Sequence, residues 1–440
     1  MTSEWGEVAV EKLLAVPLRN GLNRPTAVRG EGTKMLNMGE LFAHPRIRNV
    51  PMERVPLSET EAQAYLLEPG DLLFARQSLV LSGAGKCSVF LGASEPVTYE
   101  GHIIRARLNK DVGDPLFYYY LFASRIGRDA IESIVEQVAA AGIRGSDLAR
   151  LKVPYPPLAE QRTIAHIPGS LDDKIELDRQ MKETLEKIAQ AIFKSWFVDF
   201  DLVRAKAEGH QLVGVDVETV ALFPESLGDS PLGEIPTGWR VGRVSDLAQM
   251  KRKSVSPDAF PGEPFHHYSV PAYDEGRVPK TDPGAAIASG KYEVPAGAVL
   301  ICKLNPRFPR VWLPTVDGQG RSVCSTEFFP VIARSGFSRE YLYALFSSLS
   351  FLRPFAALVT GTSSSHQRVR PKDFLGMPVV LPDVNVVAKF TEIVKPLLQR
   401  VAHNGAESVT LAATRDALLL KLMSGEIRVK DAECFAEARP

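Results

Sequence analysis

The hydrophobic positions of the first half of the chain recur in the second half. At a constant offset of 226 residues, Leu151 matches Met377, and apolar positions then coincide without a gap as far as Ile175 and Val401. Upstream, EPGDLLFAR from residue 68 parallels PAGAVLICK from residue 295, and WGEVAVEKLLAV from residue 5 parallels WRVGRVSDLAQM from residue 239. Identity is low, but order and spacing are preserved over several segments, which predicts an internal repeat.

Within each half, the pattern changes from strand-like to helical. The globular parts are rich in Gly and Pro and carry short β-type runs such as DLLFA, HIIRARL, AVLICKL and FFPVIA. A long segment with broken seven-residue apolar series follows each of them. We therefore predict an α+β fold in which two similar mixed α/β domains are joined by two long helices that pack as an antiparallel coiled coil. The alternative is that each helix packs only on its own domain.

The boundaries follow from the same pattern. We expect a helix from about Leu158 to Phe197, preceded by the extended pair Pro156-Pro157. Pro168 and Pro396 are expected to kink or interrupt the helices, and Ser170 with Asp173 is a candidate capping box for the first one. The predicted parts are a first domain at 1–156, a helix at 157–205, a linker at 206–236, a second domain at 237–381, a second helix at 382–430 and a tail at 431–440. The predicted seam residues are Leu171, Ile175, Leu185, Ile188, Ile192, Leu397, Val401, Leu411 and Leu418.

Composition narrows the class of protein. A chain of 440 residues with 45% hydrophobic and 24% charged residues is expected to form two or more soluble domains. Without a signal-peptide pattern or an apolar run of about 20 residues, we expect a cytoplasmic protein. The four cysteines are far apart, so neither a zinc ribbon nor a disulfide framework is indicated. Lys plus Arg equals Asp plus Glu at 52 each, but residues 240–310 carry 11 basic and 7 acidic residues, and residues 158–201 carry 6 and 9.

One segment resembles a known family. PPLAEQRTIAHIPGSLDDKIELDRQMKETLEKIAQAIFKSWFVDFD is similar to the central conserved region of the specificity subunit of type I restriction–modification systems, and the following linker resembles that family's connector. The resemblance extends through both helices and the two-domain layout. Two features depart from the family pattern: Pro168-Gly169 lies inside the first helix, and PDVNVVAKF stands where the family has a PPLAEQ-type start.

The resemblance implies a division of labour among subunits. Each of two target-recognition domains would read one half of a bipartite DNA site, and the helical pair would set the gap between the halves. Two modification (methyltransferase) subunits would dock on the helices, and restriction subunits with ATP-dependent translocase and nuclease activity would join for cleavage. In the family, AdoMet and ATP belong to those partners, so this chain is expected to carry no catalytic residue, no metal and no cofactor, and to bind no membrane.

A DNA reader needs cations for phosphates and bidentate side chains for base edges. Such residues gather in loops between apolar strands of both halves, although any one of them taken alone is more typical of a solvated surface charge. The candidates are Asn20, Asn23, Arg24, Arg76, Gln77, Ser78 and Lys86 in the first domain, and Lys251, Arg252, Lys253, Lys303, Asn305, Arg307, Arg310, His366, Gln367 and Arg368 in the second. Arg76 and Lys303 occupy equivalent places in the repeat.

An aromatic cluster ends the first helix. Phe193, Trp196, Phe197 and Phe200 exceed what a two-helix seam can bury, so they are candidates for partner binding, with packing against a neighbouring domain as the alternative.

Motifs for catalysis are weak. SGAGKC lacks two positions of a phosphate-binding loop, NPRF at Asn305 departs from the adenine methyltransferase element, and His266-His267 has no third metal ligand at plausible spacing. Two functions from other classes stay open: a structural adaptor that bridges partners through its helices, and an unrecognised DNA-modifying enzyme.

Overall fold

The computed structural model describes residues 5–137, 141–210, 214–316, 320–360 and 367–427. The chain divides into two compact units. Unit 1 comprises residues 1–176 and 409–440, and unit 2 comprises residues 177–408. The predicted tail at 431–440 lies outside the described residues.

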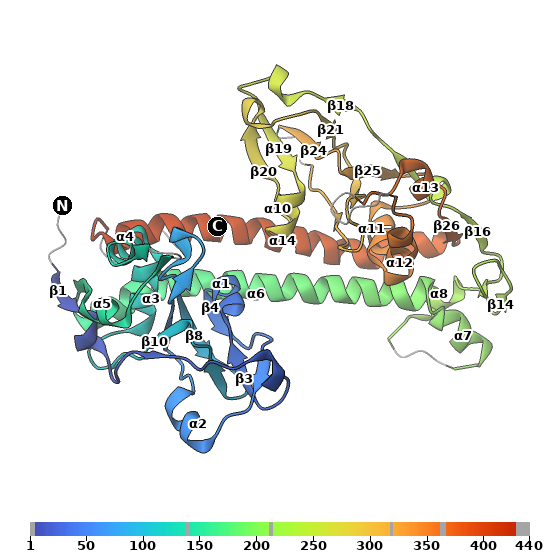
Figure 1. The fold of residues 1–440 in the computed structure, drawn as a ribbon. Helices are drawn as coiled ribbons and strands as arrows, with labels where there is room; N and C mark the ends of the chain where they lie inside the picture. Colours follow the sequence, from blue (N-terminus) through green and yellow to red (C-terminus); the bar gives the residue numbers. More distant parts are fainter. Residues whose placement is uncertain (1–4, 138–140, 211–213, 317–319, 361–366, 428–440) are drawn as a thin grey trace. The chain divides into compact units, whose positions relative to one another are not determined.

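Unit 1 is built around a five-stranded sheet (Figure 1). Its strand order is β2 (Arg19–Asn20), β10 (Ile103–Ala106), β6 (Leu72–Ala75), β8 (Cys87–Gly92) and β4 (Arg46–Arg48). A second sheet contains β5 (Glu53–Val55), β3 (Thr33–Leu36) and β9 (Val97–Tyr99), a third contains β11 (Glu136–Gln137), β12 (Ala141–Gly142) and β7 (Gln77–Ser78), and β1 (Gly6–Ala9) pairs with β13 (Lys152–Tyr155). The helices are α1 (Met38–Ala43), α2 (Glu59–Tyr65), α3 (Pro115–Ala123), α4 (Arg125–Glu132) and α5 (Gly145–Arg150).

Unit 2 repeats parts of this plan. One sheet has the order β17 (Ala248–Met250), β25 (Phe328–Ala333), β22 (Val299–Cys302) and β23 (Val311–Trp312). Another has the order β18 (Ser254–Val255), β21 (Lys291–Glu293), β24 (Arg321–Cys324), β19 (Pro264–Tyr268) and β20 (Lys280–Pro283), while β16 (Arg240–Arg243) pairs with β26 (Pro378–Leu381) and β14 (Leu227–Gly228) with β15 (Ile235–Pro236). The shorter helices are α7 (Asp201–Ala207), α8 (Val217–Ala221), α9 (Val244–Leu247), α10 (Val270–Asp274), α11 (Arg339–Ser347), α12 (Leu349–Ala357) and α13 (Pro371–Leu375).

The predicted internal repeat is confirmed by equivalent elements. In each unit the first strand pairs antiparallel with the last strand before the long helix, β1 with β13 and β16 with β26. In each unit an aromatic helix also enters the core: every residue of α3 from Phe117 to Phe122 is buried, as is every residue of α11 from Glu340 to Phe346. Asp114 and Ser338 cap the N-termini of these helices with their side chains, which satisfies a backbone N–H at each start.

The two long helices are α6 (Leu158–Phe197) and α14 (Val384–Met423), drawn green and red in Figure 1. The first helix has the expected bounds Leu158 and Phe197, so it ends before residue 205, where its predicted part ends, and the second helix ends at Met423, short of residue 430. Residues 428–430 lie outside the described part of the chain. Neither proline interrupts its helix, so the expected interruption is wrong. The residues around Pro168 are held by tertiary packing, since Ile164 and Ile167 are buried in the core of unit 1.

The expected capping box at Ser170 is also absent. Because the helix continues through Pro168, Ser170 lies inside it, and its hydroxyl donates to the carbonyl of Ile167 at 2.9 Å. Asp173 instead pairs with Arg46 of β4 at 2.9 Å. A polar side chain in a helix interior commonly turns to a carbonyl of the preceding turn or to a neighbouring element in this way.

The helices pack against each other antiparallel within each unit, which confirms the predicted coiled coil. In unit 1, Ile164 and Ala165 of α6 share a core with Leu418 and Leu422 of α14. In unit 2, Phe193 of α6 contacts Phe390 of α14 with ring centroids 5.9 Å apart. Of the predicted seam residues, Leu418 is buried and seven are half-buried: Leu171, Ile175, Leu185, Ile192, Leu397, Val401 and Leu411. Ile188 is 42% exposed, so its assignment to the seam is wrong.

Three of the cysteines are buried in the cores. Burial raises the pKa of Cys302 to about 11 and the pKa of Cys324 to about 12, and it raises the pKa of Cys87 further. The thiols are therefore protonated and unreactive at neutral pH. Within the described ranges, no helix combines the length and apolar character needed to cross a membrane.

Candidate nucleic-acid interface

The candidate loops of unit 1 meet at one edge of its five-stranded sheet. Because β2 and β6 both run antiparallel to β10, the ends of the first two strands lie beside the start of the third: Asn20 pairs with Ile104, and Ala75 with Ile103. The backbone N–H of Arg76 donates to the carbonyl of His102 at 2.8 Å. Two stretches that are far apart in sequence, 20–24 and 76–78, are thus brought together as neighbours.

Unit 2 presents the same arrangement. The strands β17 and β22 both run antiparallel to β25, with Met250 opposite Val331 and Cys302 opposite Phe328. The basic run that begins at Lys251 and the loop that begins at Lys303 therefore leave the sheet at one edge. The backbone N–H of Lys251 donates to the carbonyl of Pro330 at 2.8 Å.

Backbone hydrogen bonds establish that the two edges are equivalent. Ile143 donates its N–H to the carbonyl of Arg76 at 3.0 Å, and Val369 donates to the carbonyl of Lys303 at 3.1 Å. The N–H of Arg76 is bound by His102, and the N–H of Lys303 is bound by Glu327 at 2.8 Å. Arg76 and Lys303 thus occupy matching positions between two neighbouring chain segments, as the repeat predicts.

Not every predicted cation of unit 1 is available to a ligand. Arg24 forms an ion pair with Glu61 of α2, and its side chain is 19% exposed. Lys86 donates to the carbonyl of Phe42 at 3.2 Å and lies over that ring. Arg76 is half-buried and has no ion pair within the described residues, while Asn20, Asn23 and Gln77 are exposed and Ser78 is half-buried.

The cations of unit 2 divide in the same way. Three of the predicted residues pair with a carboxylate: Arg310 with Asp274, Arg368 with Glu327, and Lys253 with Glu293. Lys251, Arg252 and Arg307 have no ion pair in the part of the chain that the structure describes. Lys303 lies over the ring of Phe329, with its Nζ 5.8 Å from the centroid. Asn305 and Gln367 are joined through their backbones, and His366 lies outside the described residues.

The edges also contain residues that the sequence did not single out. His102 is exposed beside Arg76, and its counterpart Glu327 neutralises Arg368. His102 and Glu327 do not belong to a cluster of polar residues in the sequence. Their place at the edges is seen only when β6 is paired with β10 and β22 with β25. Two exposed apolar side chains, Leu79 and Phe308, follow the same two strands.

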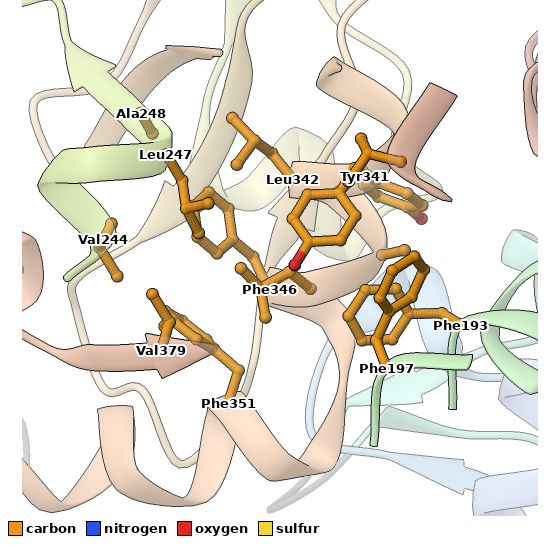
Figure 2. Packing of buried hydrophobic residues seen from close by; sticks show 14 of the residues in the cluster. Phe193, Phe197, Val244, Leu247, Ala248, Tyr341, Leu342, Phe346, Phe351 and Val379 are labelled. Atoms are coloured by element: carbon orange, nitrogen blue, oxygen red, sulfur yellow. The ribbon is translucent and has the colours of Figure 1, made fainter. Parts of the chain in front are cut away.

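The aromatic cluster at the end of α6 is in the core of unit 2, not on its surface. Phe193, Trp196, Phe197 and Phe200 are at most 7% exposed. Figure 2 shows Phe193 and Phe197 facing Tyr341 of α11. Since a partner subunit contacts exposed atoms, these four residues do not form the predicted docking surface, and the alternative of core packing accounts for them.

Ion-pair clusters attach each domain to the helices. In unit 1, buried Asp172 of α6 accepts hydrogen bonds from Tyr120 of α3 and Arg415 of α14. In unit 2, Glu186 of α6 binds Arg277 through two bonds of 2.7 and 3.0 Å and accepts a bond from Tyr343 at 3.3 Å. Burial opposes the charge of Arg277, but the bonds to Glu186 raise the pKa of Arg277 above its ordinary value.

The histidine pair does not resemble a metal site. His267 lies 3.4 Å from Asp282, and burial lowers the pKa of His267. Among the described residues, no group of three His, Cys, Asp or Glu side chains has the arrangement of a metal site.

The chain thus repeats an α+β domain and presents polar and cationic loops at the same sheet edge twice. Residues 34–187 match the sequence model of the family described as "Type I restriction modification DNA specificity domain". The comparisons confirm the resemblance to the specificity subunits of type I restriction–modification systems that was noted in the sequence.

Two curated relatives and one solved structure illustrate the similarity. The MjaIX specificity subunit of Methanocaldococcus jannaschii is 24% identical over 369 residues, covering 82% of this chain and 79% of that protein. The HindI specificity subunit of Haemophilus influenzae is 26% identical over 367 residues, covering 72% and 79%. The crystal structure of the type I restriction–modification S subunit from M. genitalium shares the fold, with a TM-score of 0.56 at 14% identity over 95% of this chain and 96% of that one.

Proposed function

We propose that each unit reads one half of a bipartite DNA site, and that the helical pair sets the gap between the halves. The observation that carries this proposal is the duplicated sheet edge, where Arg76 and Lys303 occupy equivalent positions beside other polar and cationic side chains. Two equivalent reading edges in one chain suit a recognition sequence with two specified parts. Methylation and ATP-dependent cleavage would be carried out by partner subunits.

Enrichment sequencing tests the proposal. The purified chain, supplied with modification subunits, is incubated with random-sequence duplexes, and the bound DNA is sequenced. We expect a split motif with two specified parts and a fixed gap. A single uninterrupted motif, or no enrichment, would contradict the proposal, and DNA modification by the chain alone would favour an enzyme.

Replacing Arg307 with alanine is expected to weaken binding to the enriched site by about 1–3 kcal/mol if its guanidinium is bidentate to a guanine. Arg76→Ala is the equivalent test in unit 1. Fluorescence anisotropy with enriched and scrambled duplexes provides the measurement. Equal weakening on both duplexes, with a smaller salt dependence, would show a phosphate contact only. The control is Arg353→Ala, which removes an exposed cation from α12.

The helices offer an apolar surface for two modification subunits, although not the one predicted. Leu177 and Ile188 of α6 are 52% and 42% exposed, and Val409 and Leu420 of α14 are 44% and 50% exposed. Each pair is separated by about three helical turns, which places its two members on one face. The first pair belongs to unit 2 and the second to unit 1, so each unit has one such face.

Substituting Ile188 with aspartate is therefore expected to lower co-purification of a modification subunit at least several-fold, because it places a charge in an apolar interface. DNA binding by the chain alone is expected to stay unchanged. Glu183→Asp, at an exposed position of the same helix, is the control. Undiminished co-purification of the Ile188 and Leu420 aspartate variants would exclude these faces.

A further inference from the structure

Each unit exposes an apolar loop tip at the same place in its fold. In unit 1, the segment that follows β6 and the short strand β7 exposes Leu79 at 97%, Val80 at 60% and Leu81 at 43%. In unit 2, the loop after the equivalent strand β22 exposes Phe308 at 56%. A contiguous exposed apolar patch, such as the one at residues 79–81, is typical of contact with a ligand. The presence of exposed apolar side chains in both halves of the repeat is a second observation in favour of such a contact.

The loop of unit 1 is held rigidly at its base. Ser78 Oγ accepts the N–H of Val80 at 3.2 Å, and the N–H of Gly83 donates to the carbonyl of Val80 at 3.0 Å. Arg128 of α4 donates to the carbonyls of Ser82 and Ala84 at 3.1 and 3.2 Å. The loop is thus ordered by hydrogen bonds while its apolar tip stays in water.

The end of this loop, at Gly85, is also closely packed. Gly85 has φ +64°, which suits glycine, and a Cβ there would collide with Cγ2 of Ile131 in the core. This close packing holds the end of the loop against the core, while Leu79, Val80 and Leu81 are exposed.

The loop of unit 2 is fixed by different residues to the same effect. The N–H of Phe308 donates to the carbonyl of Asn305 at 2.9 Å, and Asn305 itself donates to the carbonyl of Gln367 at 2.9 Å. Arg310 donates to the carbonyl of Phe308 at 3.3 Å, while two bonds of 2.7 and 2.8 Å hold its guanidinium on Asp274. Arg310 therefore holds a backbone carbonyl of this loop, as Arg128 holds two in unit 1.

The surroundings of both tips favour a polyanion that has apolar surfaces. The segment 76–86 contains two Lys or Arg residues and the segment 303–310 contains three, and neither segment contains Asp or Glu. Arg307 lies over the ring of Phe308, with its guanidinium carbon 4.9 Å from the centroid. Duplex DNA combines phosphates with the apolar C5-methyl groups that thymines present in the major groove.

We propose that Leu79 and Phe308 are the apolar base contacts of the two domains, and that they pack against thymine methyl groups while the neighbouring cations bind phosphates. The inference rests on the proposed function, in which these sheet edges face DNA. Rigid presentation suits this role, because a preorganised loop loses little conformational entropy on binding.

The test compares Leu79→Ser and Phe308→Ser with the wild type on the enriched duplex at several salt concentrations. Burial of one such side chain predicts about a tenfold or larger loss of affinity from each substitution. An apolar contact releases no counterions, so the slope of affinity against salt is expected to stay unchanged. Leu349→Ser, which alters a side chain that is 67% exposed on α12, is the matched control.

The outcomes separate this inference from the proposed function. If the wild type enriches a split motif and both serine variants bind it with wild-type affinity, the apolar contacts are excluded and the function stands. If affinity falls equally for scrambled duplexes with a reduced salt slope, the tips do not contact bases. Loss of co-purified modification subunit with unchanged DNA affinity would make the tips a protein contact and overturn the inference. Absence of any split motif would count against the function itself.

Discussion

Replacing Phe193 with alanine is expected to lower the free energy of unfolding of unit 2 by about 3–5 kcal/mol. The side chain is 1% exposed, and its ring centroid lies 5.2 Å from that of Phe197, 5.7 Å from Tyr341 and 5.9 Å from Phe390. Truncation would remove contacts with α11 and α14 together and leave a cavity where two long helices and a domain meet. The cost is large because this packed core has few ways to collapse.

Denaturant unfolding followed by tryptophan fluorescence measures this effect, because Trp196, Trp239 and Trp312 all lie in unit 2. The two units need not unfold together, so a single free energy of unfolding for the whole chain is not fitted. The midpoint of the unfolding transition of unit 2 is compared between variants instead. Ile188→Ala, on the exposed face of the same helix, is the control and is expected to cost less than about 1 kcal/mol. Similar midpoints for the two variants would contradict the assignment of Phe193 to the core. Phe193→Leu provides a milder change if the alanine variant does not fold.

The sequence predicts the repeat and the first helix well because both depend on periodicity. Apolar spacing fixed the bounds Leu158 and Phe197, and the offset between halves correctly paired Arg76 with Lys303. Continuity through Pro168 was not predictable, since the local penalty of a proline is offset by burial of Ile164 and Ile167 in a core that also includes residues near 418. Helix continuity at Pro168 therefore depends on tertiary packing and not on local helix propensity.

Several of the predicted DNA-binding cations form ion pairs within the fold. Arg24, Arg310 and Arg368 pair with carboxylates that lie 37, 36 and 41 residues away in sequence. Such pairing depends on how strands and loops are brought together, so local composition gives no sign of it. The prediction that the aromatic cluster binds a partner was wrong for a similar reason, because the residues it packs against, Tyr341 and Phe390, belong to elements distant in sequence. The sequence can indicate candidate loops, whereas only the fold shows which side chains in them are paired.

The largest electrostatic effect is expected at Asp172. Its carboxylate is 8% exposed, accepts a bond of 2.7 Å from Tyr120, pairs with Arg415, and lies 4.0 Å from Arg46. Burial, followed by the charge of Asp172, raises the pKa of Tyr120 above its ordinary value, so the phenol stays a donor. Asp172→Ala would leave this donor unsatisfied and place two guanidinium groups beside a site without its central anion. Removal of one partner from a buried pair predicts a loss of about 3 kcal/mol from unit 1.

Hydrogen exchange at the amides of α3 and at residues 158–176 reports the stability of unit 1 separately from that of unit 2. Faster exchange in both segments of Asp172→Ala is expected, whereas Asp173→Ala is expected to change exchange little, since that neighbouring carboxylate is 62% exposed and surface ion pairs contribute about 0–1 kcal/mol. The comparison is well matched because both residues are aspartates on one helix and both lie within reach of Arg46. If the two variants exchanged alike, the buried cluster would contribute no more than a surface pair, and the apolar contacts of Ile164, Ala165 and Leu418 would be the main attachment of the domain to its helices.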